Sequence, residues 1–121
     1  MSSRAVLATI AEGTVIPVLS PSLLEELAEV VRRPKFRGLI SAEAHAELRD
    51  LLTSQGILVT PRHQVRLSRD PDDDHLISLA LEAHAAALVT SDKDLLVLHG
   101  RLSIPVLSPR PFLRWLAHHG A

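Results

Sequence analysis

Short apolar runs alternate along the chain with longer amphipathic stretches, and this pattern predicts strands between helices. The apolar runs are bounded by Gly, Pro or polar residues, which is typical of short buried strands. They occupy residues 15–19, 57–59, 87–90 and 104–107. Helices are predicted at residues 4–12, 21–33, 42–54, 93–98 and 109–120. One more begins in the acidic stretch at 70–74, and its apolar face carries Leu76, Ile77, Ala80, Ala83 and Ala87.

Capping residues mark where several of these helices begin and end. Ser20-Pro21 and Ser108-Pro109 each place an N-cap serine before a proline that suits the first helical position. Both pairs close the same hexapeptide, Ile-Pro-Val-Leu-Ser-Pro, which occurs at residues 16–21 and 104–109. The sequence therefore predicts one strand-to-helix junction used twice. The first of these helices should end at Pro34.

This order of elements favours an α/β fold in which helices flank a mostly parallel central sheet. A chain of 121 residues suits a single domain spanning residues 1–121. In parallel sheets, ligands bind beyond the carboxyl ends of the strands. The polar residues that follow the predicted strands, Ser20, Thr90 and Ser108, mark where a site is expected.

Composition narrows the class of protein. The formal net charge of −1 provides no global positive field for nucleic acid, so such binding must be local or bridged by metal. The absence of cysteine excludes disulfides and thiolate metal sites. We find no signal peptide and no apolar run that could span a bilayer, and we expect a cytoplasmic protein without membrane contact. The histidines lack metal-ligand spacing, and His84 is expected in the core.

The most unusual stretch is Asp-Pro-Asp-Asp-Asp at residues 70–74, which gathers four carboxylates directly before a helix. An N-cap at Asp70 and the helix dipole account for one or two of these acids. Four acids together raise the cost of ionisation unless a cation lies among them. A hard ion with oxygen ligands, Mg²⁺ or Mn²⁺, is the expected partner.

Helical geometry separates the candidate ligands. Glu26 flanks the buried stripe of its helix, whereas Glu25 lies nearly opposite that stripe, and a solvated glutamate is the simpler interpretation. Asp73 falls on the inward side of its helix, although it could merely complete a capping box with Asp70. Asp92 follows a buried strand and could equally cap the next helix.

Two further acids are weaker candidates. Asp74 points away from the inward side of its helix. Asp94 is more simply explained as first-turn charge.

Four segments of the chain resemble the PIN-domain family of small metal-dependent ribonucleases, which are common as toxins of toxin–antitoxin pairs. They are Leu-Ser-Pro-Ser-Leu-Leu-Glu-Glu-Leu at residues 19–27, Arg-Arg-Pro-Lys-Phe at 32–36, Asp-Pro-Asp-Asp-Asp at 70–74 and Leu-Val-Thr-Ser-Asp-Lys-Asp-Leu at 88–95. By resemblance, Glu26, Asp73 and Asp92 match three acidic positions of the family. Asp74 is the alternative to Asp73 for the same acidic position of the family, and Asp94 matches an accessory acid.

The resemblance implies a three-layer fold and hydrolysis of RNA phosphodiesters at carboxylate-bound Mg²⁺ or Mn²⁺. It also implies a protein antitoxin as partner, and we expect a homodimer. The family, however, opens with a central strand bearing an Asp-Thr-Asn signature, and no such segment precedes Arg4. One explanation is that the natural gene extends upstream of Met1 and encodes this strand. The alternative is a catalytically incomplete PIN-like protein that binds an antitoxin or a second copy without turnover.

Overall fold

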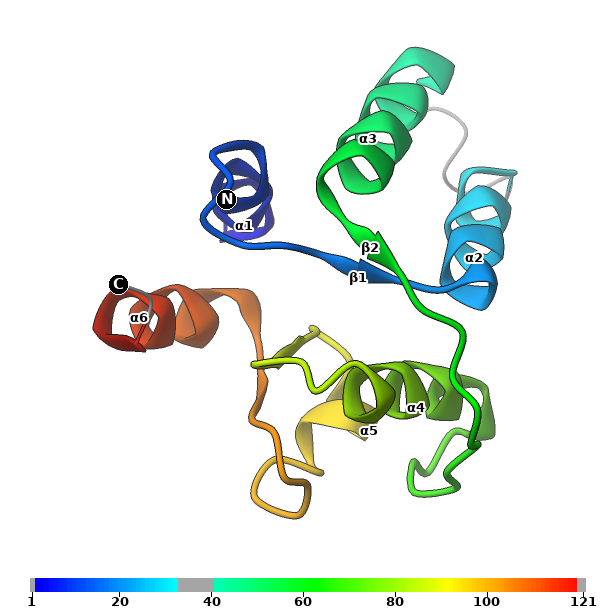
Figure 1. Ribbon diagram of the computed structural model, residues 1–121, viewed down its shortest axis with the longest axis vertical. Coiled ribbons are helices and arrows are strands. Elements are labelled where there is room, and N and C mark those ends of the chain that lie inside the picture. Colours follow the sequence, from blue (N-terminus) through cyan, green and yellow to red (C-terminus); the bar gives the residue numbers. More distant parts are fainter. Residues whose placement is uncertain (1, 33–40, 120–121) are drawn as a thin grey trace.

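The computed structural model describes residues 2–32 and 41–119, in which helices alternate with short strands (Figure 1). In chain order the elements are α1 (Ser2–Ala11), β1 (Val18–Leu19), α2 (Pro21–Arg32), α3 (Ala42–Gln55), β2 (Ile57–Leu58), the 3₁₀ turn η2 (Pro71–Asp73), α4 (Asp74–Glu82), β3 (Leu88–Val89), α5 (Lys93–Leu96), β4 (Val106–Leu107) and α6 (Pro109–His119). The predicted helix stop at Pro34 and the basic residues 33, 35 and 37 lie outside the described residues.

All four predicted strands form, but each is only two residues long. They pair in parallel as two separate sheets, β1 with β2 and β3 with β4. Val18 is in register with Ile57, and Leu88 is in register with Val106. The described residues thus form an α/β fold with parallel strands, although they do not form one continuous sheet. Among these residues, each strand has a partner on one side only.

The repeated hexapeptide produces the predicted junction in both places. β1 runs into α2 and β4 runs into α6, each through a Ser-Pro pair. At the first junction the hydroxyl of Ser20 accepts a hydrogen bond of 3.1 Å from the backbone N–H of Leu23. Ser20 thereby satisfies one of the free N–H groups at the start of α2, which fixes the direction in which the helix leaves the strand.

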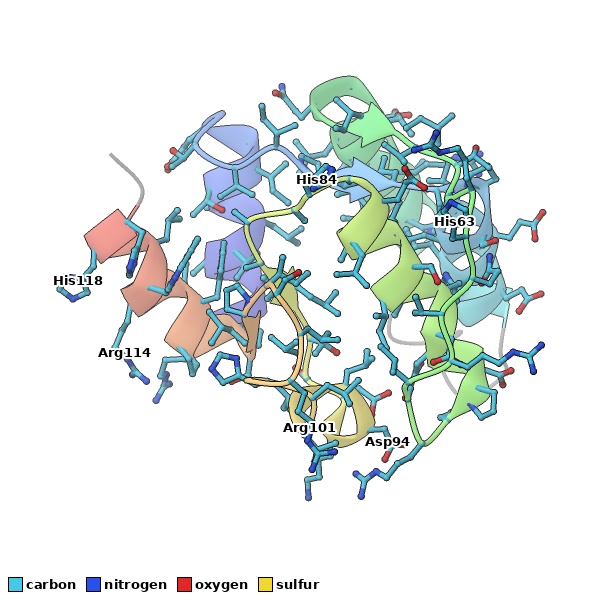
Figure 2. The ribbon with its side chains drawn as sticks, turned by 60° about the horizontal axis from the view of Figure 1, so that its bottom comes forward. His63, His84, Asp94, Arg101, Arg114 and His118 are labelled. Carbon is cyan, nitrogen blue, oxygen red and sulfur yellow. The ribbon has the colours of Figure 1, made fainter. Side chains whose placement is uncertain are left out.

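The best-packed core lies on the β3–β4 side of the molecule. Its buried members are Ile77, Leu95, Leu98 and Val106, from α4, β4 and the region of α5. The β2 side is more open, since Ile57 and Leu58 are 49% and 64% exposed. At the C-terminal end, α6 buries Phe112 and directs Arg114 and His118 outward (Figure 2).

An apolar groove of about 740 Å³ lies between the two strand pairs. Val18 of β1 and Val89 of β3 both line it, and Ile10, Ala87 and Phe112 add further apolar surface. Along a parallel strand, successive residues direct their N–H and C=O groups to opposite neighbours. Residues 17 and 19 bond to β2, and residues 88 and 90 bond to β4, so Val18 and Val89 direct theirs to the groove side.

Helix α4 ends sooner than the apolar pattern predicted, and this overturns the expectation for His84. The helix stops at Glu82, and His84 adopts a left-handed conformation with φ of 52°. One left-handed residue commonly follows a helix, and His tolerates this conformation better than most side chains. The His84 side chain is consequently exposed rather than buried in the core.

Candidate metal centre

The acidic stretch folds into a tight turn that leads into a helix. Asp70 caps the turn, and its Oδ1 accepts a hydrogen bond of 3.0 Å from the backbone N–H of Asp72. Pro71 occupies the first position, as predicted. The turn is a 3₁₀ helix, in which side chains three residues apart are aligned. This geometry places the carboxylates of Asp70 and Asp73 on the same side.

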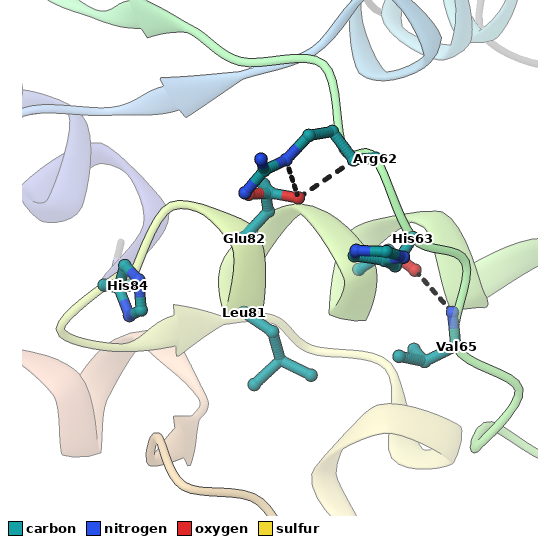
Figure 3. A pocket seen from close by; sticks show the side chains of 7 residues that line it. Arg62, His63, Val65, Leu81, Glu82 and His84 are labelled. Carbon is teal, nitrogen blue, oxygen red and sulfur yellow. Dashed lines mark hydrogen bonds and ion pairs between the residues drawn. The ribbon is translucent and has the colours of Figure 1, made fainter.

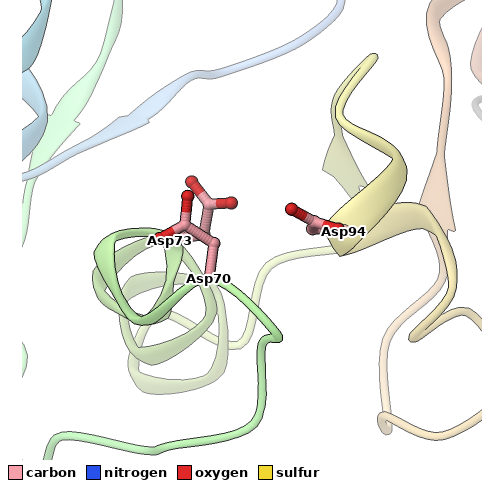
Figure 4. Close-up of side chains that lie close together, drawn as sticks. All are labelled: Asp70, Asp73 and Asp94. Carbon is pink, nitrogen blue, oxygen red and sulfur yellow. The ribbon is translucent and has the colours of Figure 1, made fainter.

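Asp94, from the first turn of α5, completes a group of three carboxylates with Asp70 and Asp73. One oxygen from each lies within 4.8 Å of the others (Figure 4). Oxygens this close can share a single cation, and oxygen donors are the ligands that hard divalent ions prefer. Acids of this type are nevertheless common without a metal, so the electrostatics of the group must be considered.

Asp73 is the acid of this site whose ionisation its surroundings oppose most. Burial raises the pKa of Asp73 to about 6, helped by the Asp92 carboxyl, which can share a proton with it, and by the charges of Asp92, Asp70 and Glu26. The Oδ2 atom of Asp73 is buried and has no hydrogen-bond partner among the described residues. A cation bound here would reduce the repulsion between Asp73 and the neighbouring acids, and it would give the buried Oδ2 a partner.

Asp92 and Glu26 approach Asp73 from different elements. Asp92 is the N-cap of α5, and its Oδ1 accepts a hydrogen bond of 2.8 Å from the N–H of Asp94. Glu26 comes from α2, where its Oε2 lies 2.7 Å from Nε2 of His75. The structure thus brings the charges of Glu26 and Asp92 to bear on Asp73, although their capping and pairing contacts also give each a structural role.

Asp74 lies apart from this group. The expectation that it points away from the inward side of its helix was wrong, because Asp74 is buried, with 8% of its surface exposed. Its Oδ1 accepts hydrogen bonds from the backbone N–H groups of Leu67 at 3.1 Å and Ser68 at 2.8 Å. These contacts tie the preceding loop to the start of α4. Asp74 therefore holds the loop, whereas Asp73 lies among the other acids.

Asp94 is paired with a basic residue. Nη2 of Arg69 lies 2.9 Å from Oδ1 of Asp94, and both side chains are largely solvated. Arg69 neutralises part of the acidic charge, and a cation would compete with it for this carboxylate.

A second polar feature lies beside α4 and has a structural explanation. Arg62 donates to Glu82 through its backbone N–H at 3.0 Å and through its guanidinium at 3.0 Å (Figure 3). These hydrogen bonds lower the pKa of Glu82. The adjoining cavity, of about 300 Å³, also contacts His63 and His84. The pair fastens the loop of residues 61–69 to α4 and leaves no clustered acids at this cavity.

The residues of the acidic centre fit a hard divalent cation, because all the donors are carboxylate oxygens and one oxygen is buried without a partner. Asp70 and His75 were not among the residues selected from sequence. The sequence indicates Asp70 only as a cap. A cap three positions before Asp73 nevertheless lies beside it when the turn is a 3₁₀ helix. The pairing of His75 with Glu26 joins positions 49 apart, and no local pattern signals it.

The fold and the site define the class of this protein. It is an α/β chain that gathers carboxylates near the ends of parallel strands. A family model described as PIN domain matches residues 1–94, and the chain belongs to the PIN-domain family. Members of this family are generally nucleases that use divalent metals.

Among curated proteins, the chain resembles the uncharacterized protein MJ1680 of Methanocaldococcus jannaschii. The two are 26% identical over 117 residues, which cover 89% of this chain and 75% of that protein. No solved structure shows a significant match to the chain. In the described part of the chain, no helix has both the length and the apolar character needed to cross a membrane.

Proposed function

We propose that this protein is a metal-dependent ribonuclease of the PIN toxin type. Glu26, Asp73 and Asp92 would be its principal metal ligands, with Asp94 as an accessory acid and Asp70 as an additional neighbour. The single observation that supports this most strongly is the convergence of the Asp70, Asp73 and Asp94 carboxylates, whose oxygens lie within 4.8 Å of one another. The charges of Asp92 and Glu26 also act on Asp73 there. Acids gathered this closely repel one another, and a bound cation would relieve that repulsion.

A bound Mg²⁺ or Mn²⁺ would supply an activated water and stabilise the charge that develops on the phosphate during in-line displacement. The carboxylates of the chain would hold and orient that ion. Asp73 must lose its proton before it can serve as a ligand. Its burial, together with repulsion from Asp92 and Asp70, opposes this step in the absence of a cation. Arg69, largely solvated beside Asp94, is available to contact an RNA phosphate.

We further propose that the native protein completes its sheet with an Asp-bearing strand encoded upstream of Met1. The groove supports this, because Val18 and Val89 direct backbone groups to it from opposite sides and its lining is apolar. A parallel strand covered on both faces needs such surroundings. One strand inserted there would pair with β1 and β3 and join the two sheets into a single three-layer fold.

The alternative is a catalytically incomplete binding protein that pairs with an antitoxin or a second copy. Two observations favour it as the second candidate: no strand joins the two strand pairs within residues 2–32 and 41–119, and the apolar residues of β2 are exposed. In either case we propose a cytoplasmic protein whose partners are a protein antitoxin and a second copy of the chain, and the catalytic form would also bind RNA.

Cleavage of a single-stranded RNA by the purified protein, with and without Mn²⁺, tests the proposal. We expect cleavage that requires the metal and is abolished by Asp73→Asn, because the amide cannot supply the lost charge. Asp72→Asn is the matched control, since Asp72 is an exposed acid one position away. Metal-independent cleavage, or equal activity of both variants, would contradict the proposed site. Absence of cleavage with metal bound would favour the binding protein.

A further inference from the structure

His75 makes a contact that the proposed chemistry has not yet used. It is the second residue of α4, and its Nε2 atom lies 2.7 Å from Oε2 of Glu26 on α2. The two side chains are 21% and 44% exposed, so the histidine is well enclosed while the glutamate remains accessible. The contact joins two helices that contribute acids to the candidate metal centre.

The other ring nitrogen indicates how this hydrogen bond is arranged. Nδ1 of His75 is buried and has no hydrogen-bond partner among the described residues. A hydrogen on Nδ1 would be a buried donor without an acceptor, which is costly, whereas a bare lone pair is tolerated more easily. The geometry therefore places the hydrogen on Nε2, from which it is donated to the Glu26 carboxylate.

We propose that His75 is a positioning residue that fixes the Glu26 carboxylate beside Asp73, an inference that rests on the proposed metal-dependent function. The hydrogen bond engages Oε2 and leaves Oε1 as the oxygen available to a cation. A glutamate on a helix surface otherwise samples several rotamers, and ordering it when metal binds reduces affinity. Hydrogen-bond partners that orient metal ligands typically change metal affinity by about 10–100-fold.

The position of His75 favours this role over a purely structural one. His75 follows directly after Asp73 and Asp74. The start of α4 therefore positions both the Asp73 carboxylate and the His75 ring that donates to Glu26. Glu26 in turn contributes to the charge that Asp73 experiences. Removing the donor should therefore affect the metal site through Glu26 and leave the apolar β3–β4 core of Ile77, Leu95, Leu98 and Val106 in place.

Calorimetry with Mn²⁺ on the full chain tests the proposal through a double-mutant cycle. We expect His75→Leu to weaken Mn²⁺ binding about tenfold. His75→Gln should recover part of the loss, because its side-chain amide can donate to Glu26. In a Glu26→Ala background, His75→Leu should have no further effect. His63→Leu is the control, since His63 is exposed and lies beside the other cavity.

A measurement without metal checks the hydrogen bond itself. Ring ¹⁵N spectra of the metal-free protein should show His75 with its hydrogen on Nε2, and Glu26→Ala should shift that signal. A hydrogen on Nδ1 alone would overturn the proposal, as would an equal loss from His75→Leu with and without Glu26.

These outcomes are distinguishable from failure of the metal site. If Glu26→Ala and Asp73→Asn weaken Mn²⁺ binding but His75→Leu does not, only the role of His75 is wrong. If none of the three changes the affinity, the proposed metal site and the role of His75 both fail.

Discussion

The carboxylate of Asp74 accepts a hydrogen bond of 2.8 Å from the backbone N–H of Ser68, six residues earlier in the chain. The same oxygen also accepts from Leu67, so one buried acid holds the end of the loop against the start of α4. Asp73, its neighbour in sequence, has no such contact at its Oδ2 and instead lies near other acids. Two adjacent aspartates therefore have different environments and should respond differently to the same substitution.

We predict that Asp74→Asn retains Mn²⁺ affinity to within about threefold, whereas Asp73→Asn and Asp92→Asn each weaken it tenfold or more, roughly 1.4 kcal/mol. The amide at position 74 keeps an oxygen that can accept from Leu67 and Ser68. Asp74→Ala removes both acceptor contacts and should destabilise the fold by about 1–3 kcal/mol. Calorimetry and thermal unfolding measure the two effects separately. A larger loss of metal binding for Asp74→Asn than for Asp73→Asn would reverse the assignment.

The raised pKa of Asp73 predicts that the metal-free protein becomes less stable as pH rises. The ordinary value is 3.8 and the folded value is about 6, so between these values the folded state binds more protons than the unfolded state. The associated stability is complete below about pH 4 and is lost as pH rises through about 6. Allowing for solvent screening, we expect a change of about 1 kcal/mol, or about 3–6 °C in Tm.

Unfolding of the metal-free protein measured from pH 4 to 8 checks this dependence, with Asp73→Asn as the comparison. The variant cannot ionise at this position, so its profile should be flatter and its stability at pH 7.5 should exceed that of the wild type. Asp72→Asn, as control, should keep the wild-type slope. Mn²⁺ affinity should rise from pH 5 to 7, because binding displaces the proton from Asp73. Identical pH profiles for the wild type and Asp73→Asn would contradict the assignment.

The ion pair of Arg69 with Asp94 predicts a small gain in metal affinity when the arginine is removed. The two groups are 2.9 Å apart but largely solvated, so the pair should contribute at most about 1 kcal/mol to stability. Arg69→Gln removes a positive charge that competes with the cation, and we expect Mn²⁺ to bind about two- to fivefold more tightly. Arg66→Gln, at an exposed arginine three residues earlier, is the control. Weaker Mn²⁺ binding by Arg69→Gln would show that Arg69 supports the site.

The groove between the two strand pairs predicts that an upstream segment stabilises the protein. Adding the residues encoded before Met1 should fill the apolar groove and give Val18 and Val89 backbone partners. Each hydrogen bond gained is worth about 0.5–1.5 kcal/mol net, and burial of the apolar lining adds to this, so the Tm should rise clearly. Metal-dependent RNA cleavage should appear in the same longer chain. An in-frame stop codon directly before Met1, together with a stable monomer of the short form, would favour the non-catalytic alternative.

The sequence was sufficient to predict most local features of this fold. Ser20 and Asp70 act as the predicted caps, and the four strands form where the apolar runs predicted them. These features depend on spacing and on contacts within a few residues, which the chain carries wherever it folds. The end of α4 was misjudged because the alanines after Glu82 continue the apolar pattern, while the left-handed residue at His84 ends the helix.

Tertiary structure decided the relations between distant residues. The contact of His75 with Glu26 depends on how α2 packs against α4, and no periodicity within either helix encodes that packing. The 3₁₀ geometry of the turn aligned Asp70 with Asp73, whereas a regular α-helical wheel had left Asp70 as a cap alone. Apolar patterns indicate which residues are buried, but partners and separations are set by three-dimensional packing. The sequence therefore indicated that acids gather around Asp73, and only the fold determined that Asp70 and Asp94 join it in one cluster while Asp74 holds the loop.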